Sequence, residues 1–135
     1  MFKLNNLIAL SFILFFTSVM AAPTAPIKAI HTQDLSEMIM VGKTLVILDA
    51  RSTPYDDLTR IPGAKLLPYN TPENDIKEAI PGRDSMIVVY CTSTKCPASN
   101  YLAERLVRLG YKNVNKYQEG IVAWIAAGNP IEIDK

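Results

Sequence analysis

The fold class of this chain is decided by the stretch Met86-Ile87-Val88-Val89-Tyr90-Cys91-Thr92-Ser93-Thr94-Lys95-Cys96-Pro97. Its first five residues form an apolar run rich in strand formers, which is typical of a strand covered on both faces in a parallel sheet. The polar loop that follows leads into residues 98–109, where apolar side chains recur at helical spacing until Gly110. A strand, a loop and a helix in this order predict an α/β domain.

Segments on either side repeat this alternation. Further strands are predicted at residues 44–48 and 113–117, and further helices at residues 32–42, 71–80 and 121–127. Thr32 is the predicted N-cap of the first of these helices, while Thr71 caps the second and Pro72 is its first residue. Ligands of such sheets bind at the carboxyl ends of the strands. Cys91 and the segment Asp49-Ala50-Arg51, which each follow a strand, are therefore expected at the same edge.

The first 21 residues are interpreted as a secretory signal peptide. Lys3 is followed by an uncharged apolar run over residues 7–16, which is about half the roughly 20 residues that a membrane-spanning helix needs. Val19 and Ala21 supply the small residues that signal peptidase requires, so cleavage is expected after Ala21. An uncleaved N-terminal anchor is the alternative.

Removal of this leader defines the expected mature chain. Residues 22–26 are expected to form a flexible tail, and residues 27–135 a domain with one core. Lys3 is the only charged residue of the leader, so 14 Lys and Arg less this one leave 13 basic against 13 acidic side chains. This balance argues against recruitment of nucleic acid or an anionic membrane by bulk charge. The mature form is expected to be periplasmic or secreted and not membrane-embedded.

Cys91 is the candidate nucleophile. Loop amides and the positive end of the helix macrodipole favour an anion there, so this thiol is expected to ionise more readily than free cysteine, whose pKa is roughly 8.5. An inert buried cysteine at a strand end is the alternative. Cys96 is the only other cysteine, and a disulfide between the two would close a ring too small to stabilise the fold much. Pairing would therefore indicate redox chemistry, which export into an oxidising compartment favours.

Five separated stretches carry a family resemblance. They are Leu48-Asp49-Ala50-Arg51, Ile61-Pro62-Gly63-Ala64, Val88-Val89-Tyr90-Cys91, Leu109-Gly110-Tyr111-Lys112-Asn113-Val114 and Gly120-Ile121-Val122-Ala123-Trp124. In this order they resemble a single-domain rhodanese, a sulfurtransferase fold, over almost all of the mature chain. The resemblance implies a central, mainly parallel five-stranded sheet flanked by helices on both faces. The chain departs from the family pattern at Arg60, where a histidine is common, at Glu119, which replaces a glycine, and in a lengthened loop after Cys91.

The resemblance implies a sulfurtransferase mechanism. A Cys91 thiolate takes a sulfane sulfur from thiosulfate or a related anionic donor, and the persulfide passes it to a thiol or cyanide. The substrate is expected to meet the loop residues Thr92, Ser93, Thr94, Lys95 and Cys96, whose amides and hydroxyls can hold an anion. Lys95 either attracts the donor or makes no specific contact. No cofactor is implied, and the expected partners are the donor and a thiol acceptor or reductant protein.

Several residue roles stay open at this point. Cys96 either acts as a resolving thiol, attacking the oxidised or persulfidated catalytic cysteine, or is a small residue at the helix start with no redox role. Asp49 and Arg51 either form a structural ion pair, which is favoured, or shape the pocket. A zinc site is not expected, because two thiols and the distant His31 fall short of the usual four ligands.

Three other functions fit parts of the pattern. A phosphatase or arsenate reductase would suit a lengthened cysteine loop, but such enzymes close the loop with an arginine, and none lies between Cys91 and Asn100. A thiol–disulfide oxidoreductase would use Cys91 and Cys96, although its usual signature is Cys-x-x-Cys. A non-enzymatic module would carry sulfur or bind a partner, and the presence of Cys91 does not separate a carrier from an enzyme.

Overall fold

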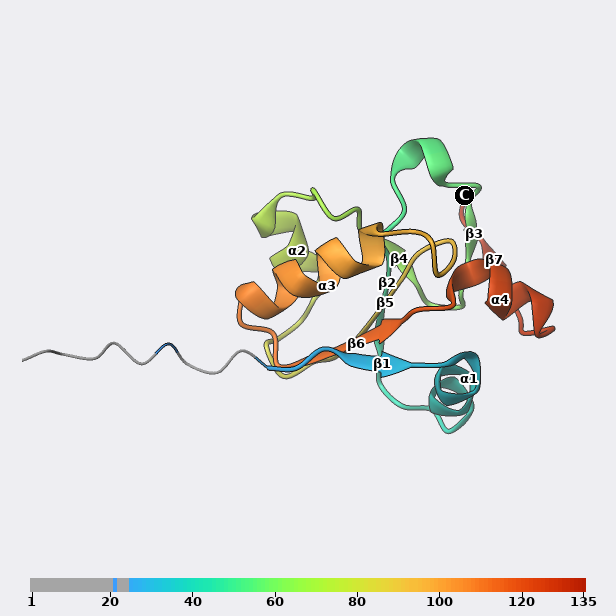
Figure 1. Ribbon diagram of the computed structural model, residues 1–135, viewed down its shortest axis with the longest axis horizontal. Coiled ribbons are helices and arrows are strands. Elements are labelled where there is room, and N and C mark those ends of the chain that lie inside the picture. The colour runs from blue at the N-terminus through green and yellow to red at the C-terminus, as the bar shows by residue number, and fades with distance from the viewer. Residues whose placement is uncertain (1–20, 22–24) are drawn as a thin grey trace, which may run out of the picture.

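The computed structural model describes Ala21 and residues 25–135, so the predicted leader and most of the tail lie outside the described residues. A five-stranded parallel sheet forms the centre of the fold (Figure 1). Its strands lie in the order β1 (Lys28–Ile30), β6 (Asn113–Tyr117), β5 (Met86–Tyr90), β2 (Val46–Asp49) and β4 (Lys65–Leu66). The predicted parallel five-stranded sheet is confirmed.

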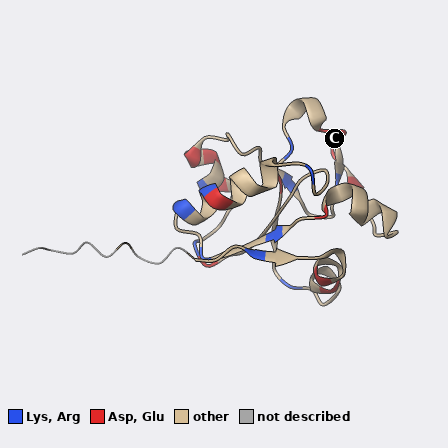
Figure 2. Ribbon diagram, in the orientation of Figure 1, with Lys and Arg blue, Asp and Glu red and all other residues tan. Residues whose placement is uncertain are grey.

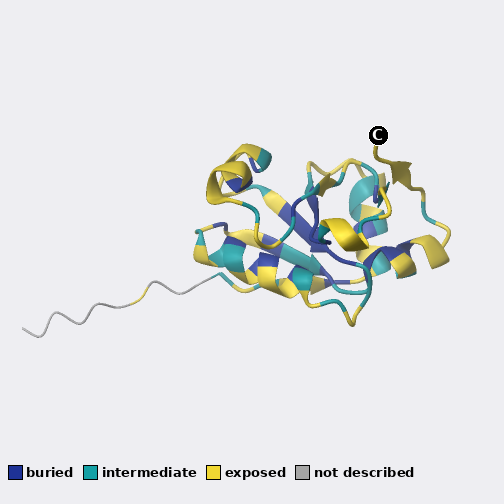
Figure 3. Ribbon diagram, turned by 90° about the horizontal axis from the view of Figure 1, so that it is seen from above, coloured by how far each residue is buried: buried dark blue, intermediate teal, exposed yellow. Residues whose placement is uncertain are grey.

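Helices cover both faces of the sheet. One face carries α2 (Glu73–Ala79) and α3 (Ala98–Arg108), and the other carries α1 (Thr32–Met40) and α4 (Gly120–Ala126). Side chains of a strand alternate between faces, so Ile87 and Val89 pack with the first pair of helices, while Val88 and Tyr90 pack with the second. This double burial explains the unbroken apolar run of β5. Figure 3 shows the buried strands between helices whose outer sides are exposed.

Two helix starts differ from the prediction by one residue. The N-cap of α1 is His31 rather than Thr32, because the Asp34 carboxylate accepts a hydrogen bond from the His31 amide at 2.8 Å. The Thr32 hydroxyl is bound elsewhere, by a side chain far away in the sequence. Pro72 has an extended ψ of 147° and caps α2, so that helix begins at the next residue.

Four short strands and a 3-10 turn lack a pattern that predicts their position. Two of them are the sheet edges β1 and β4, and the others are β3 (Thr59–Arg60) and β7 (Glu132–Ile133), which pair antiparallel. The 3-10 turn is Thr53–Tyr55, between β2 and β3. Strands of two or three residues are too short to display an alternation, so only pairing with distant partners defines them. Among the residues described, no helix has the length and apolar character needed to cross a membrane.

Candidate active site

Cys91 lies at the carboxyl end of β5, at the start of the loop that leads to α3. The neighbouring strand β2 pairs with β5 in parallel, with Asp49 opposite Tyr90. The Ala50 amide continues this pairing by donating to the Tyr90 carbonyl at 2.9 Å. The segment after β2 and the cysteine loop after β5 therefore lie together at one edge of the sheet, as the sequence predicts.

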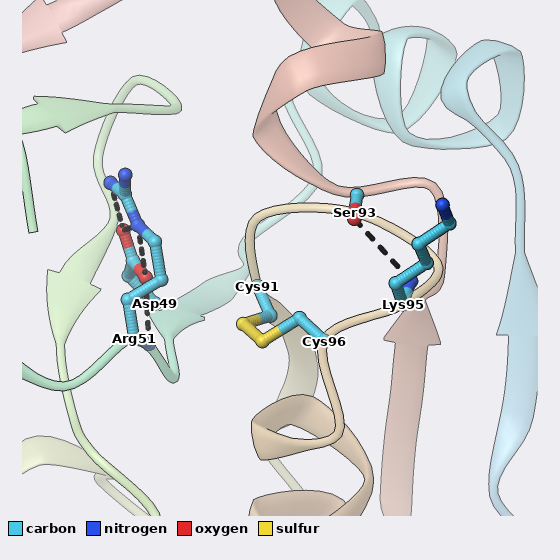
Figure 4. Close-up of a disulfide and its surroundings, with 6 residues drawn as sticks. All are labelled: Asp49, Arg51, Cys91, Ser93, Lys95 and Cys96. Carbon is cyan, nitrogen blue, oxygen red and sulfur yellow. Dashed lines mark hydrogen bonds and ion pairs between the residues drawn. A yellow bond between two sulfur atoms is a disulfide. The ribbon is translucent and has the colours of Figure 1, made fainter. Parts of the chain in front are cut away.

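Cys91 and Cys96 form a disulfide, with their Cα atoms 6.1 Å apart (Figure 4). Cys91 is only 2% exposed, whereas Cys96 is half-buried. The pairing that the sequence left open is present in this state of the molecule. Because only a thiolate is a nucleophile, Cys91 becomes reactive after this bond is reduced. The catalytic role of Cys91 and the resolving role of Cys96 stay predictions.

The loop between the two cysteines offers free hydrogen-bond donors. Within the described part of the chain, the amides of Thr92, Ser93 and Thr94 donate no hydrogen bond. The Cys96 amide, in contrast, donates to the Ser93 carbonyl at 3.1 Å. Helix α3 follows at once and has no side-chain cap, so its first amides add to the positive end of the helix. These amides are available as donors next to Cys91, and their role in holding an anion stays a prediction.

A cavity of about 440 Å³ opens over this loop. It is lined by the predicted residues Arg51, Cys91, Thr92, Ser93, Lys95 and Cys96, and also by Ser52, Tyr55, Pro97 and Ala98. Thr94, which the sequence places with the substrate-binding residues, is exposed and does not line it. The volume lies in the range typical of small-molecule sites.

Tyr55 is the main cavity residue that the sequence reasoning missed. It belongs to the 3-10 turn after β2 and is 75% exposed. Its signal in the sequence is weak, because a turn residue shows no periodicity. The rule that ligands bind beyond the carboxyl ends of parallel strands extends to this turn, and it is the only sequence argument that points to Tyr55.

Asp49 and Arg51 form a buried ion pair (Figure 4). The Arg51 Nη2 donates to Asp49 Oδ2 at 2.7 Å, and its Nη1 donates to Asp57 Oδ1 at 2.9 Å. Burial opposes the charge on Arg51, but the hydrogen bonds and attraction of the two carboxylates outweigh it and raise the pKa of the guanidinium. The structural ion pair is therefore present, and Arg51 also lines the cavity, whereas Asp49 does not. A role of either residue in shaping the pocket stays a prediction. The guanidinium of Arg51 is occupied by carboxylates.

Asp49, Arg51 and Asp57 form a charged cluster, and Arg60 connects this cluster to the C-terminal strand. Its guanidinium donates to both Asp56 oxygens at 2.5 and 2.7 Å, and it lies 3.2 Å from an Asp134 oxygen. The hydrogen bonds from Arg60 lower the pKa of Asp56 to about 2. The arginine found where the family commonly has a histidine therefore ties the segment after β2 to the end of the chain.

The start of α4 packs directly against the cysteine loop. The Ile121 amide donates to the Cys91 carbonyl at 3.0 Å, and the Val122 amide donates to the Thr92 carbonyl at 3.1 Å. Gly120 has a φ of +76°, and a Cβ atom there would lie 2.5 Å from the Thr92 carbonyl oxygen. Glycine is required here for both its conformation and its lack of a side chain. The two amides and this close contact hold the base of the loop in place.

Glu119 joins the start of α4 to the start of α1. Its carboxylate accepts hydrogen bonds from the Thr32 amide at 2.7 Å and from the Thr32 hydroxyl at 2.6 Å. It also lies 2.9 Å from the His31 Nδ1. The Thr32 hydroxyl and His31 lower the pKa of Glu119, and the hydrogen bond and charge of Glu119 raise that of His31. The departure at position 119 therefore fixes an interhelix contact beside the loop.

Charge near the cavity is mixed. Figure 2 shows that Lys and Arg, like Asp and Glu, are distributed over several elements of the fold. Lys95 is exposed and lines the cavity, but its ammonium makes no ion pair with the described residues. It is therefore available to attract an anion, and that role stays a prediction.

A family model for the rhodanese-like domain matches residues 31–127. The chain belongs to this family. The match spans β5, the cysteine loop and α4. No curated protein is similar enough in sequence to count as a match.

Solved structures of other rhodanese-like proteins have the same fold. A rhodanese-like domain protein from Staphylococcus aureus is 26% identical, with a TM-score of 0.65 over 81% of this chain and 100% of that one. A rhodanese-related protein from Thermoplasma volcanium is 28% identical, with a TM-score of 0.61 over 79% of this chain and 99% of that one. A thiosulfate sulfurtransferase from Pseudomonas aeruginosa has a TM-score of 0.67 at 20% identity, over 81% of this chain but 21% of that one. At this identity the last likeness shows the fold alone.

Proposed function

We propose that this rhodanese-like protein is a sulfurtransferase. It moves a sulfane sulfur from thiosulfate or a related anionic donor to a thiol or cyanide through a Cys91 persulfide. The observation that carries the proposal is the position of Cys91, at a strand end in a cavity, beside three loop amides that have no acceptor among the described residues. Such donors stabilise an anion on sulfur both before and after the transfer.

The transfer needs one nucleophilic step. The Cys91 thiolate attacks the outer sulfur of thiosulfate, a sulfur–sulfur bond forms, and the electron pair of the broken bond leaves with sulfite. The persulfide then carries one negative charge, as the thiolate did. The loop amides of Thr92, Ser93 and Thr94 are the donors expected to bind either anion. A thiolate or cyanide acceptor removes the outer sulfur and restores the Cys91 thiolate.

The surroundings favour sulfur over phosphate or arsenate. A phosphatase of this fold would bind the oxyanion through an arginine in the cysteine loop. Arg51 lines the cavity, but Asp49 and Asp57 occupy its guanidinium. A persulfide has a single charged sulfur, and hydrogen bonds from backbone amides are sufficient to stabilise it.

The disulfide favours a second candidate activity, in which Cys96 resolves the persulfide. The Cys96 thiolate attacks Cys91 Sγ, the outer sulfur leaves as hydrosulfide, and the disulfide of the structure forms. A separate dithiol then has to reduce the protein by two electrons. This activity would make the chain a thiol–disulfide redox protein as well as a sulfur acceptor. The third candidate is a carrier that holds sulfur and passes it to a partner protein.

Mass spectrometry of the reduced protein tests these candidates together. Thiosulfate is expected to add one sulfur atom to Cys96→Ser and none to Cys91→Ser, which is the matched control. If Cys96 resolves, the wild type instead releases one equivalent of sulfide and returns to the disulfide mass. The same test is made with thiosulfate, polysulfide and mercaptopyruvate as donors. The sulfurtransferase proposal is refuted if, with all three, Cys96→Ser gains no sulfur and the wild type releases no sulfide. Repeated formation of thiocyanate from cyanide separates an enzyme from a carrier.

Export is part of the proposal and rests on the leader-like first 21 residues alone. In a periplasmic or extracellular location the cytoplasmic thiol pool is out of reach, so the disulfide would persist. A thiol reductant protein is then the partner that sets how much Cys91 is free. N-terminal sequencing of the exported protein is expected to start at Ala22, and an intact Met1 would contradict cleavage.

A further inference from the structure

We propose that Cys96, and not Cys91, is the sulfur that an external thiol attacks when the disulfide is reduced. The inference rests on the proposed role of Cys91 as the nucleophile of sulfur transfer. It goes further by assigning the direction in which the disulfide opens and the residue to which a reductant becomes attached. Two independent features of the loop carry it, namely the exposure of the two cysteine residues and the donors available to each thiolate.

The two cysteines differ in access. Cys91 is 2% exposed, and its carbonyl accepts a hydrogen bond from the Ile121 amide at the start of α4. Cys96 is half-buried and lies where the loop meets α3, next to the exposed Pro97. Both residues line the cavity, so a thiol enters from the same side in either case. Cys96 is therefore the more accessible of the two cysteines.

The two cysteines also differ as leaving groups. A disulfide is cleaved faster when the departing thiolate is the more stable one. Departure of Cys91 leaves its thiolate beside the amides of Thr92, Ser93 and Thr94, which have no acceptor in the part of the chain that the structure describes. Cys96 is followed by Pro97, which has no amide hydrogen, and its own amide is bound to the Ser93 carbonyl. The positive end of α3 acts on both sulfurs, because they are bonded to each other, so it does not distinguish the two thiolates. The loop amides do distinguish them, and attack at Cys96 therefore releases the better stabilised thiolate.

The reaction balances as two thiol–disulfide exchanges. In the first, the reductant thiolate forms a bond to Cys96 Sγ, the Sγ–Sγ bond breaks, and its electron pair leaves on Cys91. In the second, another thiolate of the reductant attacks the reductant sulfur of the mixed disulfide and expels the Cys96 thiolate. The reductant is thereby oxidised to a disulfide and the protein gains two electrons. Cys91 is the first thiolate to become free.

Glutathione can reveal the direction in the oxidised full chain, without any sulfur donor. The reaction is quenched with acid at early times, free thiols are blocked with a maleimide, and the protein is digested with trypsin. Cleavage after Lys95 separates the cysteines into peptides Asp84–Lys95 and Cys96–Arg105. The expected result is at least about a ten-fold excess of glutathione on the Cys96 peptide, with the maleimide on the Cys91 peptide.

The same reaction in concentrated guanidinium is the control, because unfolding removes both the burial and the amide donors. Glutathione should then divide between the two peptides within about two-fold. An excess on Cys91, an even division in the folded protein, or the same excess in the unfolded chain would overturn the proposal. The assay is independent of sulfur uptake. If glutathione prefers Cys96 but the reduced protein forms no persulfide with a sulfur donor, only the proposed function is rejected. If the persulfide forms but glutathione does not prefer Cys96, only the proposed direction of disulfide reduction is rejected.

Discussion

Replacement of Gly120 by alanine tests whether α4 holds the cysteine loop by direct backbone contact. The added Cβ would lie 2.5 Å from both the carbonyl carbon and the oxygen of Thr92, and 2.7 Å from the Cys91 oxygen. These are backbone atoms, so no side chain can rotate to make room. Either α4 or the loop must move, and the hydrogen bonds from Ile121 and Val122 resist both movements.

Gly128 provides a matched control at the other end of α4. It has the same φ of +76°, but a Cβ there would meet nothing within 4 Å. Gly128→Ala therefore carries only the cost of a left-handed backbone, about 1–2 kcal/mol. Gly120→Ala adds an overpacking cost of about 1–3 kcal/mol. The expected loss of unfolding free energy is about 2–5 kcal/mol for Gly120→Ala.

Guanidinium denaturation of the oxidised proteins measures both losses, and the uptake of sulfur from thiosulfate by the reduced proteins reports on the loop. Gly120→Ala should also slow persulfide formation, since displacement of the Thr92 carbonyl turns the neighbouring amides. Gly128→Ala should leave that rate near the wild-type value. Equal losses of stability in the two variants, within about 0.5 kcal/mol, would refute the contact argument.

The remaining predictions concern the charged groups around the site. Asp49→Asn removes the carboxylate that pairs with buried Arg51, so an unfolding free energy lower by about 3 kcal/mol is expected in denaturation. Lys77→Ala, which breaks an exposed pair on α2, should cost less than about 0.5 kcal/mol, and equal costs would contradict the role of burial. Glu119 raises the pKa of His31, so their pairing stabilises the fold below the unfolded-state pKa and is lost as pH rises through the folded-state value. The stability excess of wild type over His31→Gln should be larger near about pH 6 than near about pH 8.5, and an excess independent of pH would exclude this pairing.

Long apolar patterns predicted their elements well. β5 begins and ends at the predicted residues, and α3 ends within one residue of its prediction. These segments are covered by other elements along their length, so their sequences show the period that burial demands. The edge strands β1 and β4 are too short for such a period. Tyr55 was missed for the same reason, since it belongs to a three-residue turn.

The site residues divide in a similar way. Cys91, its loop and the segment after β2 are neighbours because parallel strands end at one edge, and this follows from the order of elements alone. The charged cluster around Arg51 and Arg60 does not follow from the order of elements. Arg60 contacts Asp134 across 74 positions of sequence, and no local pattern marks this pair. Only the antiparallel pairing of β3 with β7 brings them together.

The α/β class, the position of Cys91 at a strand end and the second cysteine in the same loop all follow from the order of residues in the chain. These depend on residues close together in the chain, where apolar periodicity and breaker residues act locally. The tertiary structure decided that Cys91 is buried while Cys96 is half-buried, and that Gly120 touches the Thr92 backbone. It also decided that Arg51 is neutralised by carboxylates. A periodic pattern says which face of an element is apolar, but packing of the whole chain selects what covers that face.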